Sequence, residues 1–351
     1  MPNYPLAKTY FNIKTDNLVT LEEKHMTDIW NGMQQTGVWE DVTPEQLHNH
    51  IIPRNQPAIL RGFASDWPIV GQSDEQLFNQ LSKYNQQKSV ATLSGGAEMQ
   101  GRFFFDKDFR SFNFESKNMP LETVFQQLLD YRKQKNPPHL YAAPINVADV
   151  FPGLSSQIPV PHLEHIKNKA GSLWIGNRTK IAAHWDQQDN IAVVVHGKRR
   201  FTLLPPEQIS NLYIGPLDAT IAGRPISMVD FNNPDFQQHP KFRDAIKEAQ
   251  MAVLAPGDAL YIPSMWFHHV ESLEDIGVLY NIWWRESSTA KTENPFHTLV
   301  RSLMSISHMP QPERQAWKAL YDHFIFQEKS NLISHLPEES RGVLKHMTPQ
   351  L

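Results

Sequence analysis

The chain has 351 residues and a mass of 40.4 kDa, enough for one large domain or two modest ones with a substantial core. Its net charge of -4 argues against a protein that coats nucleic acid or an anionic membrane. No cysteine occurs, which excludes disulfides, thiolate zinc sites, iron–sulfur clusters and cysteine nucleophiles. Without an apolar run of about 18 residues or an apolar leader, we expect no membrane span and a cytoplasmic location.

The first part of the chain is predicted to be mainly helical. A helix is expected over Leu21–Gly37, and Thr43–Gln46 and Ser73–Gln76 each carry the signature of a capped helix start. Between those two signatures, Pro57–Leu60 reads as a short apolar strand. Apolar residues from Leu121 to Leu129 recur at the spacing of a helix with one buried face.

Short strands dominate from Ser172 onward, and their density predicts a sandwich or jelly roll. The stretch from Tyr213 to Arg243 is rich in Asp, Asn, Pro and Gln and is expected to form a long insertion or lid. The predicted strands are Ser172–Gly176, Ile191–His196, Arg200–Leu204, Met251–Leu254, Ala259–Ile262, His268–Ser272 and Gly277–Trp284.

The end of the chain is predicted to be helical again. Asn294 can cap a helix whose first residue is Pro295, with an apolar stripe over Phe296–Met304. A second stripe covers Trp317–Phe324. Two such helices cannot bury their apolar faces alone, so they must pack on the core or on a partner subunit.

The strongest chemical signal is His184-Trp185-Asp186, between two apolar stretches. Residues i and i+2 of a strand face the same side, so His184 and Asp186 would point into one cavity. A further histidine would complete a two-histidine, one-carboxylate set, which suits non-haem Fe(II) and leaves positions open for substrate and dioxygen. His162-Leu163-Glu164 and His269-Val270-Glu271 share the spacing, so the motif alone is weak.

The third ligand should come from the segment that runs from Gly257 to Val270. Adjacent strand residues point to opposite faces, so His268 and His269 cannot both bind the metal. Strand periodicity alone does not choose between them.

These motifs together resemble the JmjC/cupin-like 2-oxoglutarate oxygenases, and among them the asparaginyl hydroxylase of the hypoxia-inducible factor. The resemblance runs from about Pro53 to Trp284. It is carried by His184-x-Asp186, Gly197-x-Arg199-x-Phe201, Pro256-Gly257-Asp258, Tyr261-Ile262-Pro263 and Trp266-Phe267-His268, with Asn55–Gly62 as an opening strand.

The resemblance implies a double-stranded β-helix of the cupin/JmjC type, mainly β with flanking helices. We expect an N-terminal helical and β-edge region over residues 1–130, a catalytic core over 131–290 and a C-terminal helical segment over 291–351. In the hypoxia-related hydroxylase, C-terminal helices interlock across a dimer, so the resemblance also implies a homodimer.

The resemblance implies the metal set His184, Asp186 and His268, because the family places its distal histidine five residues after the proline matched by Pro263. Fe(II), 2-oxoglutarate and O2 would be the reactants, and the keto acid would chelate the iron. Decarboxylation to succinate would accompany hydroxylation of a C–H bond.

The far carboxylate of 2-oxoglutarate would be held by Arg199, at a position where the related hydroxylase has lysine, and by Tyr141. Asn190 and Asn281 match polar residues near the co-substrate, and Trp283 matches a wall aromatic. The chain departs from the pattern at Ile181, where a threonine is expected, and at Arg199.

The predicted function is hydroxylation of a side chain of a protein or peptide by an Fe(II)- and 2-oxoglutarate-dependent dioxygenase. Small molecules and modified RNA bases are substrates of related folds, although the charge of this chain makes nucleic acid the less expected partner. Demethylation of N-methyl lysine is a less favoured variant. The alternatives are a catalytically silent metal-binding cupin, which Ile181 and Arg199 favour, and a zinc hydrolase with Glu271 as its base.

Overall fold

The computed structural model divides the chain into two compact units, Met1–Glu286 and Ser287–Leu351. Among the residues that it describes, no helix is both long and apolar enough to cross a bilayer. Those residues are 33–218, 220–221, 223–285, 294–327, 332–342 and 344.

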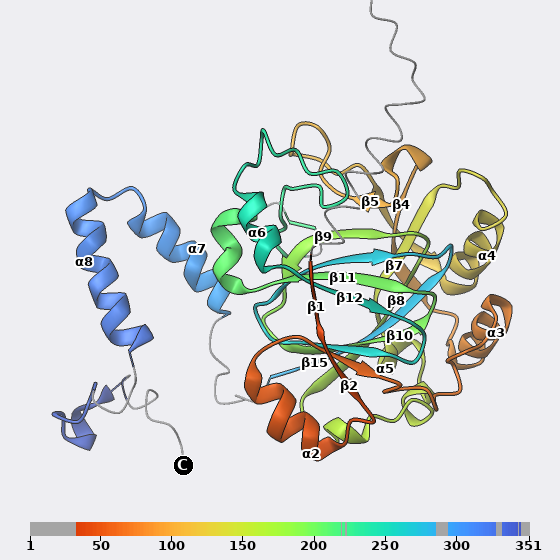
Figure 1. The fold of residues 1–351 in the computed structure, drawn as a ribbon, viewed down its shortest axis with the longest axis horizontal. Helices are drawn as coiled ribbons and strands as arrows, with labels where there is room; N and C mark the ends of the chain where they lie inside the picture. The colour runs from red at the N-terminus through yellow and green to blue at the C-terminus, as the bar shows by residue number, and fades with distance from the viewer. Residues whose placement is uncertain are drawn as a thin grey trace, which may run out of the picture. The chain divides into compact units, whose positions relative to one another are not determined.

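The first unit is built around two β-sheets (Figure 1). One has the strand order β1-β12-β11-β14-β9-β5 and the other has the order β2-β3-β13-β10-β15-β8-β7-β4-β6. The last eight strands of the chain are divided four to each sheet, which gives the predicted jelly roll. They are β8 (Lys169–Gly176), β9 (Lys180–Trp185), β10 (Asp189–His196), β11 (Arg199–Leu204), β12 (Gln250–Leu254), β13 (Ala259–Ile262), β14 (Phe267–Ser272) and β15 (Gly277–Trp284).

The segments before Ser172 supply more strands than predicted. They are β1 (Gln34–Gln35), β2 (Gly37–Glu40), β3 (Ala58–Arg61), β4 (Ser89–Gly95), β5 (Arg102–Phe103), β6 (Glu115–Pro120) and β7 (His139–Asn146). The end of the predicted helix Leu21–Gly37 is wrong, because Gln34–Gln35 is a strand; its residues 21–32 lie outside the described residues. β1 forms because it pairs in parallel with β12, a contact that no local pattern reveals.

The other predicted helices of the first unit are confirmed. α2 (Pro44–Gln46) and α3 (Asp74–Tyr84) both begin with the expected capping box, from Thr43 and Ser73. α4 (Leu121–Tyr131) buries its predicted apolar face. Two short helices, α5 (Val147–Val150) and α6 (Phe242–Glu248), were not predicted.

Two separate apolar layers follow from the alternation of side chains along the strands. Outward residues of the nine-stranded sheet, such as Ile191 and Val193, pack with α3 and α4, where Phe78 stacks on Phe125. Inward residues of both sheets, such as Val194 and Phe201, fill the space between the sheets. The alternation places one face of each central strand inside the jelly roll.

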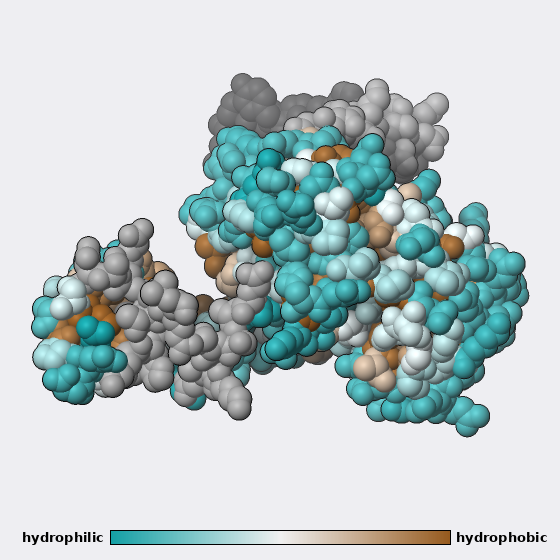
Figure 2. All heavy atoms as spheres, turned by 90° about the horizontal axis from the view of Figure 1, so that it is seen from below, coloured by the Kyte–Doolittle hydropathy of each residue, from teal (hydrophilic) through white to brown (hydrophobic). Residues whose placement is uncertain are grey.

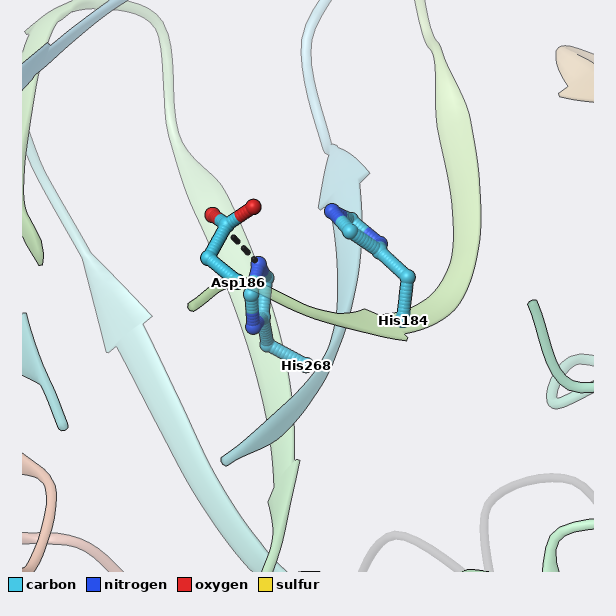
Figure 3. A group of neighbouring side chains, drawn as sticks. All are labelled: His184, Asp186 and His268. Atoms are coloured by element: carbon cyan, nitrogen blue, oxygen red, sulfur yellow. Dashed lines mark ion pairs between the residues drawn. The ribbon is translucent and has the colours of Figure 1, made fainter. Parts of the chain in front are cut away.

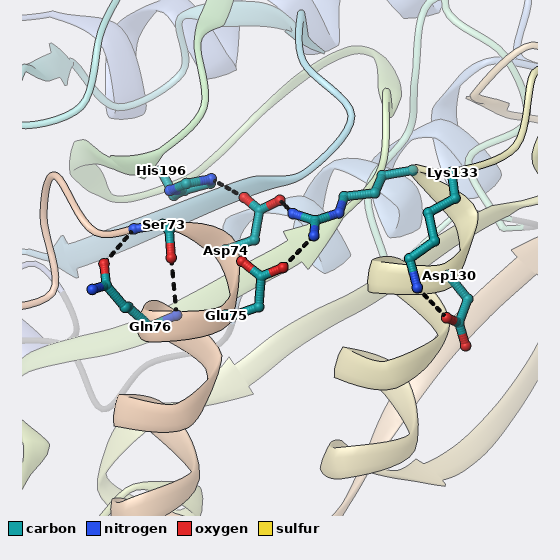
Figure 4. A network of polar contacts seen from close by, with 8 residues as sticks. Ser73, Asp74, Glu75, Gln76, Asp130, Lys133 and His196 are labelled. Carbon is teal, nitrogen blue, oxygen red and sulfur yellow. Dashed lines mark hydrogen bonds and ion pairs between the residues drawn. The ribbon is translucent and has the colours of Figure 1, made fainter.

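Ion pairs fix the start of α3 against its surroundings (Figure 4). His196, at the end of β10, lies 2.6 Å from Asp74 Oδ1, and Arg132 pairs with both Asp74 and Glu75. This network connects α3 and the end of α4 to β10, the strand that also carries Asn190.

The second unit contains α7 (Pro295–Ile306) and α8 (Gln311–Tyr321), followed by a π-helical turn over Asp322–Phe326. The N-cap by Asn294 is confirmed. Neither helix has a buried residue.

Candidate metal centre

Strand pairing brings the predicted ligands together from distant parts of the chain. β14 runs antiparallel to β9, and His268 is the direct partner of His184 in that register. Asp186 follows the last residue of β9 and lies two positions after His184, so all three side chains point toward one another (Figure 3).

One ligand atom from each side chain lies within 4.8 Å of the others. His268 Nε2 is 3.8 Å from Asp186 Oδ2, and the two imidazole rings have centroids 4.3 Å apart. These separations leave space for one ion at the centre of the three groups. The structure therefore meets the geometric requirement of the predicted triad.

Backbone carbonyls fix the orientation of both imidazoles. Nδ1–H of His184 donates to the carbonyl of Ala182 at 2.9 Å, and Nδ1–H of His268 donates to that of Trp266 at 3.0 Å. In each ring Nε2 is therefore the nitrogen that remains to bind an ion. Such outer contacts are typical of metal-binding histidines.

The protonation states also suit a metal. Burial and the neighbouring His184 lower the pKa of His268 to about 4, so its ring is neutral at neutral pH. Burial alone would raise the pKa of Asp186, but His268, His184 and Arg224 hold it below its usual range. A neutral imidazole and an ionised carboxylate are the forms that coordinate metal ions.

His269 points to the other face of β14. Its ring packs on Phe231 at a centroid distance of 4.8 Å, and its Nε2 is 4.0 Å from Glu271 Oε2. Glu271 in turn bonds Arg200 Nε at 2.6 Å. Neither His269 nor Glu271 lines the cavity at the triad, so the structure offers no support for Glu271 as the base of a zinc hydrolase.

A cavity of about 400 Å³ opens beside the three ligands. Much of its wall is apolar, from residues such as Leu93, Ile262 and Leu279. It brings together every site residue predicted from the sequence, namely Tyr141, His184, Asp186, Asn190, Arg199, His268, Asn281 and Trp283.

Arg199 is the most unusual residue in this wall. It is only 1% exposed, and its Nε and Nη2 have no hydrogen-bond partner among the described residues. Burial lowers its pKa, which the nearby Tyr141 counteracts, and burial raises the pKa of the Tyr141 phenol. A buried cation with free donors beside a protonated phenol is suited to an anionic ligand.

The remaining predicted residues are tied to one another or to the triad. Asn281 Nδ2 donates to Asn190 Oδ1 at 2.8 Å, across the neighbouring strands β15 and β10. Trp283 does more than form a wall, because its indole Nε1–H donates to Asp186 Oδ2 at 3.1 Å. It therefore helps to orient a predicted metal ligand.

Arg224 is a site residue that the sequence did not reveal. Its Nε–H donates to Asp186 Oδ1 at 3.1 Å. It lies in the predicted insertion Tyr213–Arg243, which is hydrogen-bonded to β9 through Ser227 N and Ala183 O at 2.7 Å. An arginine in a loop carries no pattern that would place it beside a carboxylate 38 residues earlier.

The donor set fits a divalent ion of the first transition row. Two imidazoles and one carboxylate on one side leave the cavity side open, as in non-haem Fe(II) sites. Arg199 lines the same cavity, and its N–H groups that are unpaired among the described residues suit an anionic ligand.

Comparison with known proteins agrees with this architecture. A family model described as a cupin-like domain matches residues 44–290. The tRNA wybutosine-synthesizing protein 5 of Danio rerio is 31% identical over 271 residues, which cover 71% of this chain and 74% of that protein. The human protein of the same name is 26% identical over 310 residues, which cover 78% of this chain and 90% of that protein.

A shorter match is to the lysine-specific demethylase JMJ31 of Arabidopsis thaliana, which is 30% identical over 117 residues, 33% of this chain and 21% of that protein. The resemblance to JmjC and cupin-like proteins is therefore confirmed, and these homologues suggest an oxygenase. The particular likeness to the asparaginyl hydroxylase stays a prediction. By its sequence and its fold, the chain belongs to the cupin-like domain family.

Proposed function

We propose that this chain is an Fe(II)- and 2-oxoglutarate-dependent dioxygenase that hydroxylates its substrate. One observation carries the proposal: the cavity that holds His184, Asp186 and His268 also holds a buried arginine with unused donors. A metal-binding cupin without catalytic activity would need the metal ligands but not the buried arginine. When bound together, Fe(II), 2-oxoglutarate and O2 supply the oxidising chemistry.

The protein's own groups would prepare this chemistry by orientation and charge. The carbonyls of Ala182 and Trp266 hold the two imidazoles with Nε2 toward the ion. Arg224 and Trp283 each donate to a different oxygen of Asp186, which limits rotation of the carboxylate. The ligands are thus in place before the ion arrives, which reduces the cost of binding it.

Arg199 and Tyr141 would bind the distal carboxylate of 2-oxoglutarate. The charge of Arg199 is desolvated by the surrounding wall, so its attraction to a carboxylate is stronger than it would be in water. The buried phenol of Tyr141 stays protonated and is available as a donor. Asn190 and Asn281, on neighbouring strands, would form the part of the cavity wall next to the co-substrate.

A side chain of a protein or peptide is the substrate that the sequence resemblance favours. The comparisons favour a second candidate, a nucleoside of tRNA, because the relatives matched along most of their length are named for tRNA wybutosine synthesis. The match to a lysine-specific demethylase covers a third of this chain and makes N-demethylation a weaker variant. The net charge of -4 argues against coating nucleic acid but does not oppose a tRNA that reaches one cavity.

The test of the reaction is succinate release by anaerobically purified protein given Fe(II), 2-oxoglutarate and air. We expect slow turnover without substrate and faster turnover with the right substrate. Tryptic peptides and bulk tRNA would be supplied in parallel, and the pool that accelerates succinate release identifies the substrate class. No succinate from a protein that still binds iron through His184 would support the silent cupin instead.

We also propose a homodimer through the C-terminal helices. Most residues of the apolar stripes predicted on α7 and α8 are exposed to solvent, as the brown spheres on the unit that carries α8 show in Figure 2. Apolar patches of this kind mark interaction surfaces. The exposed apolar residues are Leu299, Leu303, Met304, Trp317, Leu320, Phe324, Ile325 and Phe326.

A further inference from the structure

Trp174 lines the cavity of the metal centre and carries an unused hydrogen-bond donor. It lies in β8, where Ser172 and Trp174 line the cavity while Leu173 and Ile175 face the outer core. Its indole Nε1 is buried and has no hydrogen-bond partner among the described residues. Buried donors are nearly always paired, so this one calls for a partner.

Packing fixes the position of this indole. Its ring is stacked against Tyr141, at a centroid distance of 6.0 Å and an interplanar angle of 30°. On another side, Trp283 meets it edge to face at 5.7 Å. A ring that is held between two aromatic neighbours cannot turn its N–H to solvent without breaking these contacts, so the donor is preorganised.

The unused indole N–H of Trp174 lies in the same cavity wall as Ile181, a position that lacks an expected donor. Ile181 stands where the resemblance leads us to expect a threonine hydroxyl, and its side chain can donate nothing. Trp174 and Ile181 pack against the same apolar cluster as Tyr141, and both line the cavity. In the same wall, Arg199 Nε and Nη2 are also unpaired among the described residues.

We propose that the indole N–H of Trp174 donates a hydrogen bond to the distal carboxylate of 2-oxoglutarate, in place of the hydroxyl that Ile181 lacks. The carboxylate would then be bound by Arg199, Tyr141 and Trp174 together. This inference rests on the proposed function, because it takes 2-oxoglutarate as the co-substrate. It makes Trp174 a binding residue that motif comparison alone does not find.

The chain offers a matched control in Trp284. Its indole Nε1 is likewise buried and without a partner among the described residues, and its ring is stacked against Tyr261 at 6.2 Å. Trp284 belongs to the outer core and does not line the cavity. A tryptophan-to-phenylalanine change removes the N–H together with two ring carbons at either position, so the two variants are matched in the atoms that they delete.

The experiment is calorimetric titration of Mn(II)-loaded protein with 2-oxoglutarate, without O2. We expect Trp174→Phe to weaken 2-oxoglutarate binding by about tenfold to a hundredfold, the effect of losing one hydrogen bond to a charged group. Trp284→Phe should bind as the wild type does. The affinity for 2-oxobutyrate, which lacks the distal carboxylate, should be the same in Trp174→Phe and wild type.

A second variant tests the exchange of donors directly. Ile181→Thr in the Trp174→Phe background should recover part of the lost affinity, since it restores a hydroxyl. Unchanged Mn(II) binding in each variant shows that the site is folded.

Equal 2-oxoglutarate affinity in Trp174→Phe and wild type would overturn this inference and leave the proposed function standing. A parallel loss of affinity for 2-oxobutyrate would also overturn it. Failure of the wild type to bind any 2-oxoglutarate would overturn the proposed function, and this inference with it.

Discussion

At the scale of single residues, the adjacent histidines His268 and His269 show how a strand separates two identical side chains. One faces Asp186 inside the jelly roll, and the other faces Phe231 and Glu271 on the opposite side. Both are 4% exposed, so burial does not distinguish them. Only the side of the strand decides which can bind a metal.

We predict that His184→Ala, Asp186→Ala and His268→Ala each reduce the affinity for Fe(II) more than about a hundredfold, because each removes a ligand rather than an outer contact. His269→Ala should retain wild-type iron. Metal analysis after anaerobic purification measures both results. Loss of iron in His269→Ala, with iron kept in His268→Ala, would show that the other imidazole is the ligand.

The neighbours Lys198 and Arg199 differ in the same way. Arg199 is buried in the cavity wall, whereas the Lys198 side chain is 58% exposed and its Nζ lies 4.0 Å from Glu274. Arg199 therefore belongs to the cavity, whereas Lys198 belongs to the solvent-exposed surface.

Arg199→Ala should raise the 2-oxoglutarate concentration at half-maximal succinate release by at least about tenfold, because a charged hydrogen-bond partner is lost. Lys198→Ala should change it less than about twofold, as expected for an exposed charge. Equal effects of the two substitutions would refute the assignment of Arg199 to the co-substrate.

At the scale of elements, strands of the jelly roll were predictable because β-branched and aromatic residues alternate or cluster in them. β4 has a weaker alternation, and the edge strand β6 is mostly exposed and polar, so it leaves no hydrophobic signal. Both form because β4 pairs with β6 on one side and β7 on the other. Such pairing is a tertiary property.

A buried ion pair joins β11 to β14. Arg200 and Glu271 are direct partners in the strand register, and Arg200 Nε lies 2.6 Å from Glu271 Oε2. The Glu271 side chain is 4% exposed. Burial alone would raise the pKa of Glu271, but Arg200, His269 and Asn232 together outweigh this effect and hold the pKa below its usual range. A carboxylate with a lowered pKa stabilises the fold at neutral pH and loses that contribution as the pH falls below about 4.5.

Glu271→Ala should therefore lower the free energy of unfolding by about 1.5–3 kcal/mol at pH 7, since it removes a charged hydrogen-bond acceptor from Arg200. The difference from wild type should shrink as the pH falls below about 4.5, the usual pKa of a glutamate. Urea unfolding at several pH values measures it. Glu274→Ala, at an exposed glutamate, is the control and should cost less than about 0.5 kcal/mol. A difference that does not vary with pH would contradict the role of the ion pair.

At the scale of the whole molecule, the C-terminal unit has an apolar surface whose contact with water is unfavourable. Met304 is 73% exposed and Phe326 is 74% exposed. A monomer with these side chains in water would forgo the free energy of burying them. This is the physical reason for the proposed homodimer.

Leu303→Asp combined with Leu320→Asp should convert a dimer into a monomer, because buried charges without partners oppose association. Light scattering coupled to size-exclusion chromatography gives the mass directly. Gln315→Asp, an exposed polar position in α8, should leave the mass unchanged. A wild-type protein that is monomeric at micromolar concentration would refute the dimer.

The fold class, the helix starts at Thr43, Ser73 and Asn294, and the candidate metal ligands could all be predicted from the amino-acid sequence. These predictions depend only on local patterns, namely the alternation of polar and apolar residues, helix-capping residues and the spacing of motifs. Strand periodicity could place His184 and Asp186 on one face, but it could not choose between His268 and His269 without the family resemblance. The tertiary structure was needed to show that Arg224 and Trp174 reach the same cavity and that Trp283 donates to Asp186, because these contacts depend on long-range pairing of segments.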